Sequence, residues 1–205
     1  MGAETGHDAQ RPAARVLVLG IGNILWADEG FGVRTVEAFH RRFETDAEVT
    51  ILDGGTQGLY LVDHVASHDL LLVFDAIDYG LEPGTVHLVR DAEVPRFTGN
   101  KKMSLHQTGF QEVLSAADLL GRYPTSLALI GCQPVDLEDW GGPLTGPVAA
   151  AIGPALDLAL EVLAGWGIAV RPRTVPLPPE QQLLANDIDH AAYERHAAAG
   201  SAPAA

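Results

Sequence analysis

The sequence predicts a three-layer α/β/α sandwich on a mostly parallel central sheet of about five strands, one of them antiparallel. Three observations indicate this fold. Several short runs are apolar at every position, as is typical of strands that helices cover on both faces. The segments between these runs repeat their apolar residues at helical spacing. Glycine and acidic residues gather where the runs end, as in the loops of an open α/β sheet.

The first strand is expected over residues 16–19, an apolar run that precedes Gly20 and Gly22. These glycines allow the backbone to turn tightly. A helix is then expected over 29–43, because apolar residues recur roughly at helical spacing at Phe31, Val33, Val36 and Phe39.

The second strand is expected over 48–52, and it ends at the turn Asp53-Gly-Gly-Thr56. A helix should follow over 57–67. Its buried face is expected to carry Leu59, Val62, Val65 and Ala66. These two elements repeat the strand-then-helix order of the first pair.

The third strand, 69–76, is expected at the centre of the sheet, because its segment Leu70-Leu-Leu-Val-Phe74 is wholly apolar. The connection 77–84 contains glycine and proline and is too short for a crossover helix. The next strand, 85–90, is therefore expected to be an antiparallel hairpin partner.

The last part of the sandwich is expected to contain a helix over 106–121, a strand over 126–131 and a helix over 147–165. A long loop, 133–146, joins this strand to the final helix. It is rich in glycine, proline and acidic residues.

The domain organisation follows from length and composition. With 205 residues and 47% hydrophobic content, the chain is long enough for one well-buried domain and short for two. We place this single α/β domain at residues 15–170. Residues 1–14 are polar and rich in glycine and alanine, so we expect a disordered leader. Residues 171–205 begin with several prolines and end in alanine and glycine, so we expect a partly disordered tail.

The composition narrows the classes of partner. The formal net charge is −14, with 13 Lys and Arg against 27 Asp and Glu, which argues against nucleic acid and anionic membranes. The single cysteine, Cys132, excludes an internal disulfide and fits a reducing compartment. No sorting signal and no run of about 18 apolar residues is present. We expect a cytoplasmic protein without direct membrane insertion.

Acidic residues follow the first three expected strands, and a histidine opens a later helix. Glu29 follows the first strand, Asp53 the second and Asp75 the third, while His106 comes after a loop that contains glycine. Because the carboxyl ends of parallel strands meet at one edge of a sheet, these residues should gather there. Two carboxylates and one imidazole suit a divalent transition metal and leave coordination positions open for exchange.

Several of the polar residues near the strand ends also have a simpler explanation. Asp28 precedes the helix and could cap it, whereas Glu29 lies one residue too late to do so. Asp53 could begin the turn and bind backbone amides of its loop. Asp78, in the loop directly after Asp75, is the exposed-loop alternative to Asp75. His106, taken alone, could make local hydrogen bonds at a helix start.

Other kinds of site fit less well. The dinucleotide fingerprint fails because Leu25 occupies the third glycine position after Gly20 and Gly22, and no lysine precedes Lys101 to form a P-loop. The only support for the alternative of a small-molecule hydrolase or nucleotide-binding domain is therefore the glycine pair, Gly20 and Gly22.

His64 and His68 have the spacing of a metal-binding pair, but the glutamate of a zinc-protease helix is missing. We expect them on a solvated face. Cys132 follows an apolar strand, and a buried, inert thiol is expected there. Ser104 lacks a nucleophile elbow. We find no convincing covalent nucleophile.

Five motifs stand in order along the chain: Gly20-Ile-Gly-Asn-Ile-Leu-Trp-Ala-Asp-Glu-Gly-Phe-Gly-Val33, Asp53-Gly-Gly-Thr56, Asp75-Ala-Ile-Asp78, Ser104-Leu-His-Gln-Thr-Gly-Phe-Gln-Glu112 and Ile130-Gly-Cys-Gln-Pro-Val-Asp-Leu-Glu-Asp-Trp-Gly-Gly142. Together they resemble the [NiFe]-hydrogenase maturation endopeptidases, and the last motif looks most like the branch that serves membrane-bound uptake hydrogenases. The resemblance runs from about Arg15 to Gly165. Cys132 departs from the pattern, since an aliphatic residue is expected in relatives.

The resemblance implies a protease that removes a C-terminal extension from the hydrogenase large-subunit precursor after nickel insertion. It assigns metal contacts to Glu29, Asp75 and His106, with Asp53 as a supporting residue. The nickel would be presented by the precursor, and other divalent metals could substitute for it. The alternative is a non-enzymatic nickel-binding chaperone or scaffold, which needs the same ligands but no hydrolysis.

Overall fold

The computed structural model describes residues 14–46, 48–94 and 105–184, and for residues 105–108 it describes the backbone alone. Its main sheet has five strands in the order β3-β1-β4-β6-β5. Four of these are parallel: β1 (Val16–Ile21), β3 (Val49–Gly55), β4 (Leu70–Ala76) and β6 (Ser126–Cys132). The fifth, β5 (Val86–Arg90), runs antiparallel to β6. The predicted mostly parallel sheet with one antiparallel strand is confirmed.

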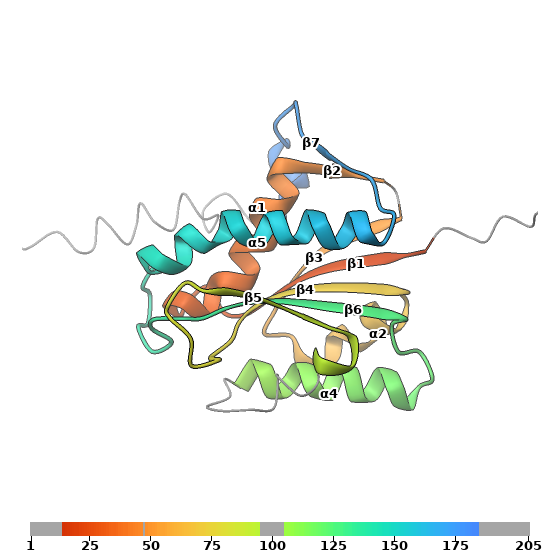
Figure 1. Cartoon of the computed structure of the whole chain (residues 1–205), viewed down its shortest axis with the longest axis horizontal. Helices are drawn as coiled ribbons and strands as arrows, with labels where there is room; N and C mark the ends of the chain where they lie inside the picture. The colour runs from red at the N-terminus through yellow and green to blue at the C-terminus, as the bar shows by residue number, and fades with distance from the viewer. Residues whose placement is uncertain (1–13, 47, 95–104, 185–205) are drawn as a thin grey trace, which may run out of the picture.

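Helices cover both faces of the sheet (Figure 1). Helices α1 (Phe31–Arg42) and α5 (Gly146–Gly165) lie on one face, and α2 (Val62–Ala66) and α4 (Leu105–Leu119) lie on the other. Each strand sends alternate side chains into the two cores. In β1, Val16 and Val18 pack towards α1 and α5, whereas Leu17 and Leu19 pack towards α2 and α4. This explains why the central strands are apolar at every position.

Helix α5 is the one helix in the described part of the chain that is long and apolar enough to cross a membrane. This property was not predicted from the sequence. Its buried side chains, among them Val148, Leu156 and Leu163, belong to the core between the sheet and α1. We therefore describe α5 as a core helix of the sandwich.

Strand β5 corrects one prediction. Its antiparallel orientation is as expected, but it is not a hairpin partner of the preceding strand, because β6 lies between β4 and β5. The physical reason is burial. Strand β6 is buried at every position after Ser126, whereas β5 is mostly exposed or half-buried, so the more apolar strand takes the inner place.

Several connections form short 3-10 helices that the sequence analysis did not separate. These are η1 (Ala27–Gly30), η2 (Gly58–Leu61) and η3 (Asp91–Glu93). The helix predicted over 57–67 is thus η2 followed by α2. Leu59, predicted to be buried, is 57% exposed, because the tighter 3-10 turn rotates it away from the core that Leu61 and Val65 enter.

A second, two-stranded sheet joins β2 (Phe43–Thr45) to β7 (Val170–Pro172). The first part of the predicted tail is therefore docked: Arg173 donates to the Phe43 carbonyl oxygen at 2.9 Å, and His40 Nε2 lies 2.8 Å from the carbonyl oxygen of Gln181 in η4 (Pro179–Gln181). The rest of the tail after residue 184 and the leader before Ala14 lie outside the described residues.

Candidate active site

Two glycines place the start of α1 against the ends of two central strands. A Cβ at Gly32 would overlap the carbonyl oxygens of Ile21 and Phe74, at the carboxyl ends of β1 and β4. Gly22 has φ +133°, and a Cβ there would overlap the carbonyl oxygen of Glu29. Close approach of backbone to backbone therefore holds Glu29 above the sheet edge.

Asp75 is the last polar residue of β4 and is buried. It follows Leu71 and Val73 on the face that α4 covers. Burial raises the pKa of the Asp75 carboxyl well above its ordinary value, and the charge of Glu29 raises this pKa further. A hydrogen bond from the backbone of Ala76 opposes both effects. The Glu29 carboxylate thus lies close enough to Asp75 to disfavour the charged form of Asp75, an arrangement that a proton or a cation relieves.

Asp28 does not cap helix α1. Its buried carboxylate accepts four hydrogen bonds from the loop after β6 and the start of α5: Oδ2 from the backbone nitrogens of Val135 and Asp136 at 2.8 and 3.0 Å, and Oδ1 and Oδ2 from the backbone and hydroxyl of Thr145 at 2.7 and 3.0 Å. The capping interpretation is wrong because Asp28 lies within η1, two residues before Gly30, which is at the cap position of α1, and no side chain among the described residues caps that helix. Asp28 joins the loops beside the site.

Asp53 lies on the other face of the sheet from Asp75. Its Oδ1 accepts a hydrogen bond from the Gly55 backbone nitrogen at 2.9 Å, as its turn-forming interpretation requires. Burial raises the pKa of Asp53, and the Gly55 hydrogen bond and the charge of Arg34 on α1 oppose this. A second residue of α1, Glu37, raises this pKa. The structure therefore connects Asp53 to its own turn and to α1, and its supporting role at the site stays a prediction.

His106 lies in the first turn of α4, whose backbone alone is described there. The start of α4 is at the same sheet edge as Glu29 and Asp75. Gly109 and Phe110 line a cavity of about 270 Å³ together with Ile21, at the end of β1, and Gly55, at the end of β3. Among the described side chains, which do not include that of His106, no three metal-ligating groups are close enough to bind a metal. The three-residue ligand set stays a prediction.

The turn after β4 is held by two residues with structural roles, Asp78 within the turn and Gln133 directly after β6. Asp78 accepts hydrogen bonds at Oδ1 from the Gly80 backbone and from Gln133 Nε2, both at 3.0 Å. The side-chain oxygen of Gln133 also accepts from the backbone nitrogens of Tyr79 and Leu81 at 2.8 and 3.1 Å. Gln133 thus fixes the turn beside Asp75 to the end of β6. Sequence reasoning missed it because no local pattern indicates a contact over 54 residues.

Cys132 is buried at the end of β6. Burial raises the pKa of its thiol to about 12, and the charge of Asp28 contributes. The thiolate is the nucleophilic form of cysteine, so this side chain is unreactive near neutral pH. The predicted burial of this thiol is confirmed, and its inertness stays a prediction.

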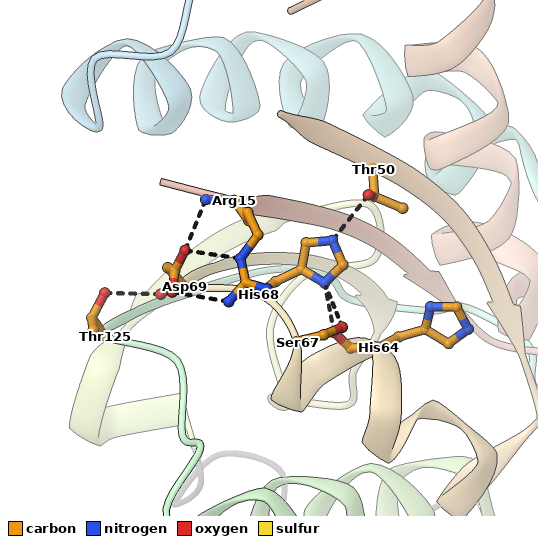
Figure 2. Close-up of polar contacts among 7 residues, drawn as sticks. All are labelled: Arg15, Thr50, His64, Ser67, His68, Asp69 and Thr125. Carbon is orange, nitrogen blue, oxygen red and sulfur yellow. Dashed lines mark hydrogen bonds and ion pairs between the residues drawn. The ribbon is translucent and has the colours of Figure 1, made fainter. Parts of the chain in front are cut away.

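His64 and His68 do not form a metal site. Figure 2 shows the His64 ring pointing away from His68. His68 Nδ1 lies 2.6 Å from the His64 carbonyl oxygen and Nε2 lies 2.9 Å from Thr50 Oγ1, so both ring nitrogens have local partners. Arg15 and Asp69, which pair nearby, mark this as the amino edge of the sheet, opposite the candidate site.

Comparisons with known proteins identify the family. A family model described as hydrogenase maturation protease matches residues 33–162. The hydrogenase expression/formation protein HupD of Bradyrhizobium diazoefficiens is 72% identical over 180 residues, which span 88% of this chain and 94% of that protein. The hydrogenase 2 maturation protease of Escherichia coli is 46% identical over 160 residues, covering 78% of this chain and 96% of that protein.

The fold leads to the same family. The structure of the hydrogenase maturating endopeptidase HybD from Escherichia coli matches with a TM-score of 0.74 and 45% sequence identity, covering 78% of this chain and 98% of that chain. These relatives are peptidases, which favours the endopeptidase function over the alternative of a nickel carrier without enzymatic activity. Since the family model covers more than half of the sequence, the chain belongs to the hydrogenase maturation protease family and is a hydrolase that acts on peptide bonds.

Proposed function

We propose that this endopeptidase removes the C-terminal extension of a [NiFe]-hydrogenase large-subunit precursor after nickel has been inserted. The observation that carries the proposal is the placement of Asp75 beside Glu29 at the carboxyl edge of the sheet. Two neighbouring carboxylates do not help the chain to fold. Asp75 is buried, and its ionisation in that position costs free energy. A cation brought by the substrate would offset that cost.

The nickel acts in this proposal as part of the substrate. Carboxylate oxygens of Glu29 and Asp75 and the imidazole of His106 would contact a nickel ion that the precursor already holds through its own thiolates. Binding would then depend on metal loading, so the unloaded precursor would be left uncut. Another divalent ion held in the same place could substitute for nickel.

Hydrolysis would use water as the nucleophile. The buried Cys132 thiol is protonated near neutral pH, so it does not supply a covalent step. A metal ion at the scissile bond can polarise the carbonyl group or activate water. The residues of this chain would place that bond, with Asp53 supporting the edge of the sheet through its turn.

We further propose that the protein acts in the cytoplasm, where its precursor would be processed before assembly. A single buried cysteine fits a reducing compartment, and α5, the long apolar helix, is part of the core.

The test compares site variants in one processing assay. Glu29→Gln, Asp75→Asn and His106→Ala should each reduce cleavage of a nickel-loaded precursor at least a hundredfold, while circular dichroism shows an intact fold. His64→Ala is the matched control, because His64 is an exposed histidine at the opposite edge. Wild-type cleavage by a folded His106→Ala variant would remove His106 from the site.

A nickel titration separates the carrier alternative. A site that contacts a metal already held by another protein should bind free nickel weakly, because three ligands with open positions are incomplete alone. Tight binding of nickel by the isolated protein, together with no cleavage of a loaded precursor, would favour the chaperone function.

A further inference from the structure

Two loops at the carboxyl edge of the sheet expose large apolar side chains. Leu25, in the loop after β1, is 40% exposed, and Val135 and Trp140, in the loop after β6, are 52% and 63% exposed. The Trp26 ring meets the Trp140 ring edge to face, with ring centroids 5.0 Å apart and planes at 80°. We call these four residues, Leu25, Trp26, Val135 and Trp140, the tryptophan platform.

The platform is held in place by backbone contacts between the two loops. Trp26 and Trp140 form an antiparallel β-bridge, and the Gly141 nitrogen donates to the Leu25 carbonyl oxygen at 2.8 Å. The Asp28 carboxylate binds the same loop from below. Ala27, between Trp26 and Asp28, is held at φ +35°, a strained conformation for a residue with a side chain. A surface fixed in this way loses little conformational freedom when a partner binds.

The platform adjoins the candidate site. The Glu29 backbone nitrogen donates to the Trp26 carbonyl oxygen at 2.9 Å, so the two residues belong to one turn. A macromolecule that brings a metal ion to Glu29 would therefore come next to the platform. An exposed tryptophan in a rigid setting, such as Trp140, is typical of the few residues that dominate the affinity of a protein interface.

The charge beside the platform indicates what its partner presents. Glu138 and Asp139 are exposed on the same loop, and the Asp136 carboxylate accepts from both of their backbone nitrogens, at 2.7 and 3.1 Å. An apolar centre next to acidic side chains is complementary to an apolar patch bordered by lysine or arginine.

We propose that the tryptophan platform is the docking surface for the folded body of the large-subunit precursor, and that Trp140 is its anchor. This inference rests on the proposed function for the identity of the partner. It adds that recognition has a second component, independent of nickel, in which an apolar patch of the precursor covers Trp140. The platform then increases the affinity for the precursor without taking part in hydrolysis.

Binding of the nickel-free precursor isolates this component, because no metal contact contributes to it. We would measure the dissociation constant of the full-length protein for fluorescently labelled, nickel-free precursor by anisotropy. Trp140→Ala should raise this constant about tenfold or more. Leu25→Ser, on the other loop, should also raise it, which keeps the test valid if one variant folds poorly.

Leu119→Ala is the matched control. Leu119 is 89% exposed at the end of α4, and the chain after it leads to Thr125, which bonds to Asp69 at the amino edge of the sheet. An exposed leucine there should leave the dissociation constant unchanged. Melting temperatures of all variants confirm that they are folded.

The outcomes distinguish the two proposals. Weaker binding by Trp140→Ala and Leu25→Ser, but not by Leu119→Ala, supports the platform whether or not cleavage depends on nickel. Equal binding by folded platform variants, or no binding of nickel-free precursor by the wild type, overturns the platform. Neither result changes the proposed function, whose failure is the absence of cleavage of a loaded precursor by the wild type.

Discussion

The carboxylate of Asp28 is bonded twice to Thr145, at 2.7 Å from its backbone nitrogen and 3.0 Å from its hydroxyl, across 117 residues of sequence. This contact attaches the turn that carries Glu29 to the start of helix α5. The geometry of the candidate site therefore depends on a residue that touches no substrate in our account.

Asp28→Asn tests this attachment. An amide can accept at one oxygen only, so buried donors lose partners, and the free energy of unfolding should fall by about 2 to 4 kcal/mol. Urea denaturation measures the change. Glu138→Gln is the control, because Glu138 is exposed on the loop after β6 that Asp28 binds. It should leave the free energy of unfolding within about 0.5 kcal/mol of the wild type. An Asp28→Asn variant as stable as the wild type would contradict the role assigned to Asp28.

Asp75→Asn should stabilise the metal-free protein while it abolishes processing. Because the pKa of Asp75 is raised in the folded state, the folded protein retains this proton more strongly than the unfolded chain does. The penalty is absent below the unfolded pKa of about 4 and grows as the pH rises towards the folded pKa. Replacing the carboxyl by an amide removes it.

The measurement is urea unfolding of both proteins at several pH values, without metal. The stability gain of Asp75→Asn should be largest at pH 8 and should shrink as the pH approaches about 4. A gain that is the same at every pH, or no gain at pH 8, would show that ionisation of Asp75 does not cost the fold stability.

Gly32→Ala should disturb both fold and activity. The added methyl group would meet the carbonyl oxygens of Ile21 and Phe74, so α1 must move away from the strand ends. We expect a loss of about 1 to 3 kcal/mol in unfolding free energy and a drop in processing, because Glu29 moves with the helix. The matched change, Gly153→Ala in α5, meets no atom within 4 Å and should be neutral or stabilising. Equal effects of the two changes would refute the close-approach argument.

Alkylation tests the state of Cys132. A buried thiol with a pKa near 12 should resist iodoacetamide at pH 8 in the folded protein and react fully in urea. Protein treated in this way and then freed of reagent should process precursor at the untreated rate. Rapid labelling of the folded protein with loss of activity would make Cys132 a candidate nucleophile.

Local sequence predicted the layers of this fold, because strands such as 16–19 and 70–74 are apolar at every position and only a doubly covered sheet buries both faces. It did not predict that β6 separates β4 from β5, since that order depends on which strand gains more from burial. It also missed β2 and β7, whose three-residue ladders have no periodicity to detect.

Part of the candidate site could also be predicted from the sequence. Glu29 and Asp75 were predicted together because carboxyl ends of parallel strands share an edge. Asp53 shares the edge, but strand alternation turns it towards α1, on the opposite face. Asp28 and Gln133 act through contacts distant in sequence, which one chain read alone does not reveal.

The central claim is that nickel in the precursor licenses cleavage. The most direct measurement is intact-mass spectrometry of nickel-loaded and nickel-free large-subunit precursor, each incubated with this protein under identical conditions. Our account predicts loss of a C-terminal peptide from the loaded precursor alone. Cleavage of both forms at the same rate, or of neither form when loading and pairing are confirmed, would contradict it.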